Sequence, residues 1–282
     1  MGVRHWTSGI QKASSVSGDI LLSDEGGVAV RLVTALATLT SHVRPGGFAL
    51  IGGLAVMTRL GSIHRVTDDI DGVCEQRGDD PSDIAIVLGE TGRGGIRRLI
   101  DGVKIDHIDV SDTPAAQIPR KDLPDDEWDR AFVLAHRWGL DAASPVTISA
   151  VGEGAVVATV TCLAASAASL VTMKLQSAPR RPVARVQKAA NDYLDLQRLL
   201  SNVELVPQLA DDLVRSAPHE LGGWAIERIR VDFIDRADET ARAIRRTGPA
   251  NQLGADEVEA TGAAFLTRAA GATKGRAGDH VD

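Results

Sequence analysis

Aromatic residues, cysteines and long apolar runs are all scarce in this chain of 282 residues. Phe, Trp and Tyr make up 3% of the sequence, so we expect a core built from Val, Leu, Ile and Ala. Cys74 and Cys162 show no metal-ligand spacing, and we expect both to be reduced thiols of a cytoplasmic protein. Residues 163–175 are interrupted by serines and a lysine, and residues 1–15 lack the apolar centre of a signal peptide. We therefore expect a soluble protein with no membrane partner.

An excess of positive charge is also missing. The formal net charge is −7, which argues against a protein that coats nucleic acid through its overall field. A local basic groove remains open, because residues 224–246 carry six arginines on a partly apolar frame. The alternative for these arginines is a solvated helix face, since acids are interleaved with them.

What the chain does have is a glycine turn in an apolar setting, within residues 48–71. Residues 48–51 are apolar and bounded by glycine, which predicts a buried strand. Gly52 and Gly53 follow, and residues 54–60 are good helix formers. A strand that turns through two glycines into a helix lets the backbone approach a ligand closely. It also directs the N–H groups at the start of the helix towards an anion.

Acidic residues follow this turn in alternation. We expect residues 64–71 to form a strand, which would place Thr67, Asp69 and Asp71 on one face. Neighbouring carboxylates repel each other, and Mg²⁺ is the usual reason for such a pair beside a phosphate chain. The alternative is a glycine-rich turn followed by an acidic surface strand. The two features together, in one compact unit, favour a nucleoside triphosphate (NTP) site.

The remaining pattern predicts an α+β fold. Asp101-Gly102 lies between two β-type runs and predicts a hairpin over residues 96–110, and residues 146–161 predict a second hairpin. Residues 74–80 predict a polar loop, and from residue 163 onwards the signals are helical. We expect helices at residues 27–43, 80–89, 125–138, 163–178, 183–200, 209–214, 221–234, 238–246 and 255–269.

The helical part opens with Lys174 near the end of a helix of small residues. In the next helix, Arg185, Lys188, Asp192 and Asp195 recur at spacings of three and four, which places them on one polar stripe. Periodicity alone favours a salt-bridged solvent face for this stripe.

A family resemblance changes that interpretation. The order of a glycine pair followed by R-x-T-x-D-h-D resembles the first two motifs of the nucleotidyltransferase superfamily with the DNA polymerase β type of fold. The similarity is greatest to the AbiEii/AbiGii toxin branch, which includes the MenT-like tRNA nucleotidyltransferase toxins. The residues that carry it are Gly52, Gly53, Arg65, Thr67, Asp69 and Asp71.

The resemblance extends to later motifs. A third acid of the metal site is expected on a neighbouring strand; Asp106 fits the pattern, with Asp109 as the alternative. Lys174 would contact the nucleotide phosphates, and Asp195 or Asp192 would position Lys174 or the acceptor. The chain departs from the pattern before Asp192, where Ala189-Ala190-Asn191 stands in place of a basic residue.

The resemblance also implies an architecture and an activity. We expect a loosely ordered segment at residues 1–24 and a nucleotidyltransferase domain with a mixed sheet and flanking helices at 25–163. A helical domain at 164–269 and a disordered tail at 270–282 would follow. The activity would be Mg²⁺-dependent transfer of NMP from an NTP to the 3′ end of tRNA. This toxin would block translation and would be opposed by a cognate antitoxin. A small-molecule nucleotidyltransferase, or an inert interaction module on the same fold, remains open.

Overall fold

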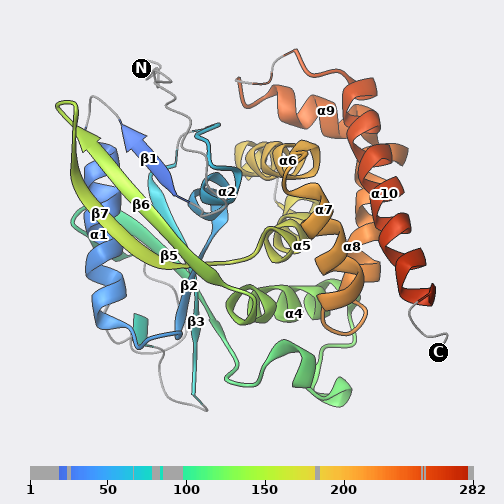
Figure 1. Cartoon of the computed structure of the whole chain (residues 1–282), viewed down its shortest axis with the longest axis horizontal. Coiled ribbons are helices and arrows are strands. Elements are labelled where there is room, and N and C mark those ends of the chain that lie inside the picture. Colours follow the sequence, from blue (N-terminus) through green and yellow to red (C-terminus); the bar gives the residue numbers. More distant parts are fainter. Residues whose placement is uncertain are drawn as a thin grey trace. The chain divides into compact units, whose positions relative to one another are not determined.

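The fold is taken from a computed structural model of the chain (Figure 1). It describes residues 19–23, 27–65, 67–77, 83–84, 98–181, 185–248, 250 and 252–278. The chain divides into two compact units. Unit 1 comprises Met1–Asp112 and Gly139–Ser166, and unit 2 comprises Thr113–Trp138 and Ala167–Asp282. The break after Ser166 lies close to the boundary expected at residue 163, whereas the grouping of residues 113–138 with unit 2 differs from the expected division.

Unit 1 is built on a mixed sheet, which confirms the α+β class. Its strand order is β1-β6-β7-β2-β3-β5-β4. Neighbouring strands run parallel in the pairs β1/β6, β2/β7 and β3/β5, and antiparallel in the pairs β6/β7, β2/β3 and β4/β5. The strands are β1 (Ile20–Ser23), β2 (Phe48–Ile51), β3 (Asp69–Glu75), β4 (Arg98–Ile100), β5 (Val103–Val110), β6 (Ser144–Gly152) and β7 (Ala155–Ala164).

Two helices of unit 1 accompany the sheet. In α1 (Val28–His42), Leu32, Leu36 and Leu39 recur at helical spacing and are buried, and the helix packs on β7 and β6. The second helix, α2 (Gly52–Leu60), begins directly after β2 without an intervening loop. The expected strand–turn–helix is therefore confirmed. The buried core of the described residues is built mainly from aliphatic side chains, as the composition predicts.

Both expected hairpins are confirmed in the part of the chain that is described. Asp101 and Gly102 have φ values of 51° and 77°, and they join β4 to β5. Two successive residues with positive φ characterise the tight turn that suits twisted antiparallel strands. Glu153 and Gly154, with φ values of 51° and 82°, join β6 to β7 in the same way.

Three local predictions for unit 1 need correction. The N-terminal segment is not loose throughout, because β1 pairs with β6 and buries Ile20 and Leu22. Four residues are too short to give a clear alternation in the sequence. Cys74 was expected to begin a loop but is fully buried in β3. The strand expected at residues 64–71 begins only at Asp69. The helix expected at residues 80–89 lies mostly outside the described residues, of which Asp83 and Ile84 are helical.

Unit 2 is helical, as expected for the C-terminal part. Its α-helices are α4 (Glu127–Asp141, which ends in unit 1), α5 (Ala167–Ser177), α6 (Val186–Ser201), α7 (Val206–Asp211), α8 (Leu221–Arg230), α9 (Ala237–Arg245) and α10 (Ala255–Gly278). Short 3₁₀ segments occur at Ala115–Gln117, Arg120–Asp122 and Ala178–Arg180, and π-helical turns at Asp212–Ser216 and Val231–Asp235. None of the helices described is long and apolar enough to cross a membrane.

Several helix boundaries differ from the prediction, and two of these differences have a clear cause in the sequence. Helix α5 begins at Ala167 rather than at residue 163, because β7 continues to Ala164 through the small residues that resembled a helix start. Helix α10 continues to Gly278, beyond residue 269, where the last helix was expected to end. Three glycines at positions 271, 275 and 278 suggested an end to the helix, but alanine, lysine and arginine between them favour helix.

Candidate metal centre

The turn between β2 and α2 in unit 1 brings backbone and side chains unusually close together. Gly52 has φ +68°, and a Cβ on it would lie 2.0 Å from Oδ2 of Asp71. A Cβ on Gly53 would lie 2.0 Å from Nη2 of Arg65. The positive φ of Gly52 and its contact with the short Asp71 side chain therefore require glycine there, whereas at Gly53 the flexible Arg65 side chain would have to move. The Asp71 carboxylate lies against the first residue of α2, where the partial positive charge of the helix favours an anion.

Asp69, Asp71 and Asp106 come together beside this turn. Asp69 and Asp71 lie on one face of β3, and Asp71 is the register partner of Asp106 on the parallel strand β5. All three side chains are half-buried, and one carboxylate oxygen from each lies within 4.8 Å of the others. The expected metal ligands are thus neighbours in space.

Asp109, the alternative third acid, lies elsewhere on β5. It is exposed, it is in register with Cys74, and its Oδ1 lies 3.6 Å from Nε2 of His107. In the register of β3 with β5, Asp71 is paired with Asp106, and Asp109 lies three residues further along the strand. The structure thus brings Asp106, and not Asp109, to the other two acids.

Thr67 and Arg65 precede β3 in an irregular segment rather than in a strand. Thr67 is buried, and its hydroxyl donates a hydrogen bond of 3.0 Å to Oδ1 of Asp69. The guanidinium of Arg65 lies over Gly53. Both residues therefore contact the site, although the alternation used to place Thr67 does not hold.

Lys104 is a member of this group that the sequence reading missed. Its ammonium forms an ion pair with Asp106 and lies 3.5 Å from Oδ2 of Asp69. Burial lowers the pKa of Lys104, but the hydrogen bond to Asp106 and the charges of Asp106, Asp69 and Asp71 outweigh burial and raise the pKa overall. A signal was available, since positions 104 and 106 of a strand share one face.

The chemistry of this donor set fits a hard divalent cation. Mg²⁺ takes oxygen ligands and is usually bound by one or two carboxylates together with water and substrate phosphates. Three carboxylates whose oxygens approach within 4.8 Å, with a glycine turn at one side, offer such ligands. Asp69, Asp71 and Asp106 are therefore the residues that could hold Mg²⁺.

Unit 2 holds a second charged cluster, around Lys174. The Lys174 ammonium lies 2.6 Å from Oδ1 of Asp192 and 2.9 Å from Oδ2 of Asp195. Oδ2 of Asp192 also accepts hydrogen bonds from Ser177 and from Nε of Arg181. The solvent-face interpretation is wrong for both acids, because their side chains are 2% and 0% exposed. Both acids hold Lys174, as the resemblance implied for one of them.

The other two basic residues of the expected stripe are less buried. Arg185 is exposed and Lys188 is half-buried. The stripe predicted from spacing therefore splits into a buried acidic part and a more exposed basic part. Arg181, which contributes to the buried part, precedes the helix and was not singled out from the sequence.

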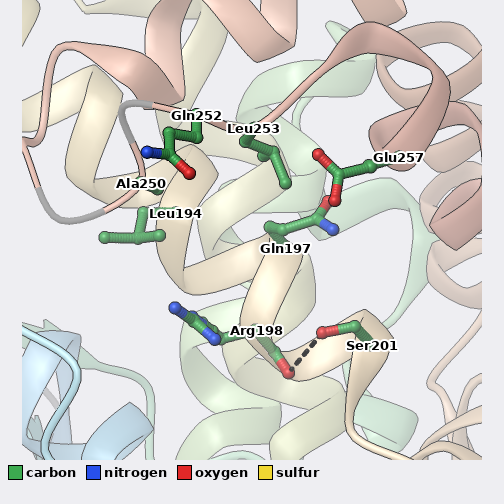
Figure 2. A pocket seen from close by; sticks show the side chains of 8 residues that line it. All are labelled: Leu194, Gln197, Arg198, Ser201, Ala250, Gln252, Leu253 and Glu257. Atoms are coloured by element: carbon green, nitrogen blue, oxygen red, sulfur yellow. Dashed lines mark hydrogen bonds between the residues drawn. The ribbon is translucent and has the colours of Figure 1, made fainter.

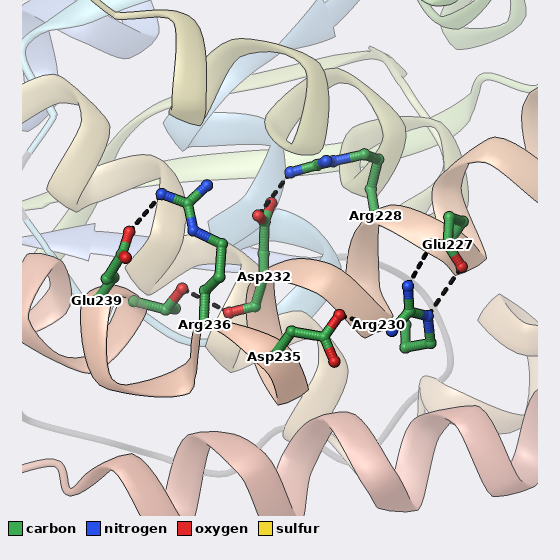
Figure 3. Close-up of polar contacts among 8 residues, drawn as sticks. Glu227, Arg228, Arg230, Asp232, Asp235, Arg236 and Glu239 are labelled. Carbon is green, nitrogen blue, oxygen red and sulfur yellow. Dashed lines mark hydrogen bonds and ion pairs between the residues drawn. The ribbon is translucent and has the colours of Figure 1, made fainter.

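Three of the six arginines of residues 224–246 pair with nearby acids in unit 2 (Figure 3). Arg230 pairs with Glu227 and Asp235, and Arg236 pairs with Glu239. Arg228 pairs with the buried Asp232. This arrangement supports the helix-face interpretation, because the acids neutralise much of the charge that a phosphodiester backbone would require.

Unit 2 also contains a pocket of about 540 Å³ that the sequence did not indicate. Figure 2 shows Gln197 and Arg198 of α6 and Glu257 of α10 among its lining residues. Gln197 is buried and donates a hydrogen bond of 2.8 Å from Nε2 to Thr261. None of the sequence motifs includes a residue of this pocket.

The chain was compared with protein-family models, with curated proteins and with solved structures. No match was found in any of the three comparisons.

Proposed function

We propose that this chain is a divalent-metal-dependent nucleotidyltransferase, which transfers NMP from an NTP to an acceptor hydroxyl. The observation that carries the proposal is the contact of the Asp71 carboxylate with Gly52 at the start of α2, with Asp69 and Asp106 beside it. Carboxylates that repel one another are thereby held next to a backbone turn suited to phosphate.

The three acids have a defined part in this reaction. Asp69, Asp71 and Asp106 would hold Mg²⁺, which when bound supplies charge stabilisation to the attacking and leaving oxygens. The acceptor oxygen forms a bond to the α-phosphorus, and the bond from that phosphorus to the bridging oxygen breaks and releases pyrophosphate. Asp106 would complete the metal site or help deprotonate the acceptor hydroxyl.

The glycine turn supplies the second requirement, a place for the polyphosphate. The residue before α2 is Ile51, whose side chain makes no capping hydrogen bond to the start of the helix. Anions bind at such helix starts through N–H groups and the helix dipole. Arg65, which lies over Gly53, adds a positive charge there.

The topology of unit 1 supports the polymerase β type of fold in this proposal. Strand β2, the turn, α2 and β3 follow in the order that the first two motifs require, and β5 supplies the third acid beside β3. By the resemblance, Lys174 would contact nucleotide phosphates and the acceptor would be the 3′ end of tRNA. An antitoxin would oppose the activity in the cell. In unit 2, the fixed geometry of Lys174 between two buried acids suits a positioning role.

The experiment is a transfer assay with labelled NTPs, each offered separately with total tRNA and Mg²⁺. The wild type should label tRNA, and Asp69→Ala should abolish labelling while retaining its circular dichroism spectrum and thermal midpoint. Asp109→Ala is the matched control, because Asp109 lies outside the acid group, and it should label like the wild type. Labelling of tRNA by Asp69→Ala at the wild-type level would contradict the proposal.

A small-molecule acceptor is the second candidate, and the arginine pairs of Figure 3 favour it. Arginines that are already paired with Glu227, Asp232, Asp235 and Glu239 offer little to an RNA backbone. The same assay with aminoglycosides in place of tRNA separates the two acceptors.

A further inference from the structure

Lys104 places a positive charge among the three carboxylates of unit 1. Its strand position is opposite Asp69 and two residues before Asp106. The ammonium is hydrogen-bonded to Oδ2 of Asp106, lies 3.5 Å from Oδ2 of Asp69, and belongs to a side chain that is 24% exposed. The carboxylates that would bind a metal are therefore already paired with an internal cation.

The pairing of Lys104 with the carboxylates stabilises the metal-free protein. Three carboxylates whose oxygens lie within 4.8 Å repel one another unless a positive charge lies between them. A lysine ammonium suits this task because it is a compact charge with three donors on a flexible stem. Lys104 thus keeps the acids together when no metal is bound.

The same pairing conflicts with metal binding. A divalent cation would use the carboxylate oxygens to which Lys104 donates, and two positive charges a few ångströms apart repel strongly in a half-buried site. We infer that Lys104 is the counter-cation of the metal-free site and leaves the carboxylates when a divalent cation binds. The inference rests on the metal site of the proposed function.

A consequence for the order of binding follows. A divalent cation has to displace the Lys104 ammonium from the carboxylates, and this costs free energy. The protein without nucleotide should therefore bind a divalent cation weakly. An NTP brings negative charge that can accept the displaced ammonium, so metal and nucleotide should bind cooperatively. Lys104 would thereby couple metal loading to the presence of substrate.

A purely structural ion pair would behave differently. Removing Lys104 would then lower stability to the same extent with and without metal, and metal affinity would stay the same or fall. A counter-cation that gives way to metal predicts the opposite: without Lys104 the metal binds more tightly, and it restores the lost stability.

The test is Mn²⁺ titration, followed by electron paramagnetic resonance, of full-length wild type and Lys104→Met, each with and without a non-hydrolysable NTP analogue. Without nucleotide, we expect Lys104→Met to bind Mn²⁺ about tenfold more tightly than the wild type. Its thermal midpoint should lie below that of the wild type without Mn²⁺ and return to it at saturating Mn²⁺. In the wild type, the analogue should tighten Mn²⁺ binding.

Two further variants control this result. Lys104→Arg keeps the positive charge and should bind Mn²⁺ as weakly as the wild type. Arg44 is matched in exposure, at 25%, and pairs with Glu75 and Asp83 away from the acid group. Arg44→Met should lower the thermal midpoint without recovery in Mn²⁺ and should leave Mn²⁺ affinity unchanged.

The outcomes separate the two proposals. Equal or weaker Mn²⁺ binding by Lys104→Met overturns the role of Lys104 and leaves the nucleotidyltransferase proposal standing. No Mn²⁺ binding by either protein, even with the analogue, overturns the metal site and with it both proposals. If Lys104→Met is unfolded without Mn²⁺, folding on addition of Mn²⁺ supports the inference, and failure to fold contradicts it.

Discussion

Gly52 and Asp71 are in such close contact that any side chain at Gly52 would collide with the carboxylate: a Cβ would lie 2.0 Å from Oδ2 of Asp71. Gly52 is the first residue of α2, and Asp71 is the third residue of β3. The helix start and the acid group are therefore one structural feature rather than two neighbouring ones.

This contact predicts a specific effect of Gly52→Ala. Alanine at φ +68° is strained and displaces Asp71, so Mn²⁺ affinity should fall along with stability. Gly61→Ala is the matched control: Gly61 ends the same helix at φ +62° with nothing within 4 Å of its added Cβ. It should cost about 1 kcal/mol of unfolding free energy and leave Mn²⁺ binding unchanged. Equal Mn²⁺ affinities for the two variants, measured by titration, would contradict the contact.

Asp106 and Asp109 differ by three positions on β5, and they should differ sharply in function. Loss even of a residue that only orients a metal ligand commonly weakens metal binding 10- to 100-fold, so removing the proposed ligand in Asp106→Asn should weaken Mn²⁺ binding by about tenfold or more. Asp109→Asn should bind like the wild type, because Asp109 lies outside the acid group. Electron paramagnetic resonance of bound Mn²⁺ measures both. The reverse ranking would mean that the register of β3 and β5 is wrong.

Lys174 should be important for the stability of unit 2. In Lys174→Met, two carboxylates that are 2% and 0% exposed lose a partner. Breaking a buried ion pair on one side typically costs about 3–5 kcal/mol, so urea unfolding should show a loss of that order. Adding both Asp192→Asn and Asp195→Asn to the Lys174→Met variant should restore part of the lost unfolding free energy. Arg215→Met, which breaks the exposed pair with Asp211, is the control and should cost no more than about 1 kcal/mol.

His136 predicts a pH dependence of stability. Burial lowers its pKa from 6.5 to about 4, while Nδ1 lies 2.7 Å from the carbonyl oxygen of Phe132. The unfolded chain therefore takes up this proton first as the pH falls. The neutral His136 ring contributes fully to the free energy of unfolding above pH 6.5. This contribution is lost as the pH falls towards 4, at up to about 1.4 kcal/mol per pH unit.

The comparison of wild type with His136→Gln isolates this contribution from that of the carboxyl groups. Urea unfolding between pH 7 and pH 4 should show wild-type stability falling more steeply than that of the variant. Parallel curves would show that the folded protein accommodates a charged His136.

Features set by local chemistry could be predicted from the sequence. Asp101-Gly102 fixed its hairpin because two adjacent residues had to adopt positive φ. Gly52-Gly53 marked the turn into α2 for a similar reason. Asp69 and Asp71 share a face because strand side chains alternate, whichever strand lies beside them.

Features that depend on distant parts of the chain could not be predicted from the sequence. The choice between Asp106 and Asp109 depends on the register of β3 with β5, which no local pattern specifies. Asp192 and Asp195 are buried because of Lys174 and Arg181, although their spacing resembles an exposed stripe. Strand β1 exists through its pairing with β6 and has no strong signal of its own.

The most direct measurement of the central claim is anomalous diffraction from crystals grown with Mn²⁺ and a non-hydrolysable NTP. The account predicts an anomalous peak about 2.1 Å from carboxylate oxygens of Asp69 and Asp71, with Asp106 at the same site and the polyphosphate at the start of α2. A structure at saturating Mn²⁺ with no peak between these acids, or with the nucleotide bound away from Gly52, would contradict it.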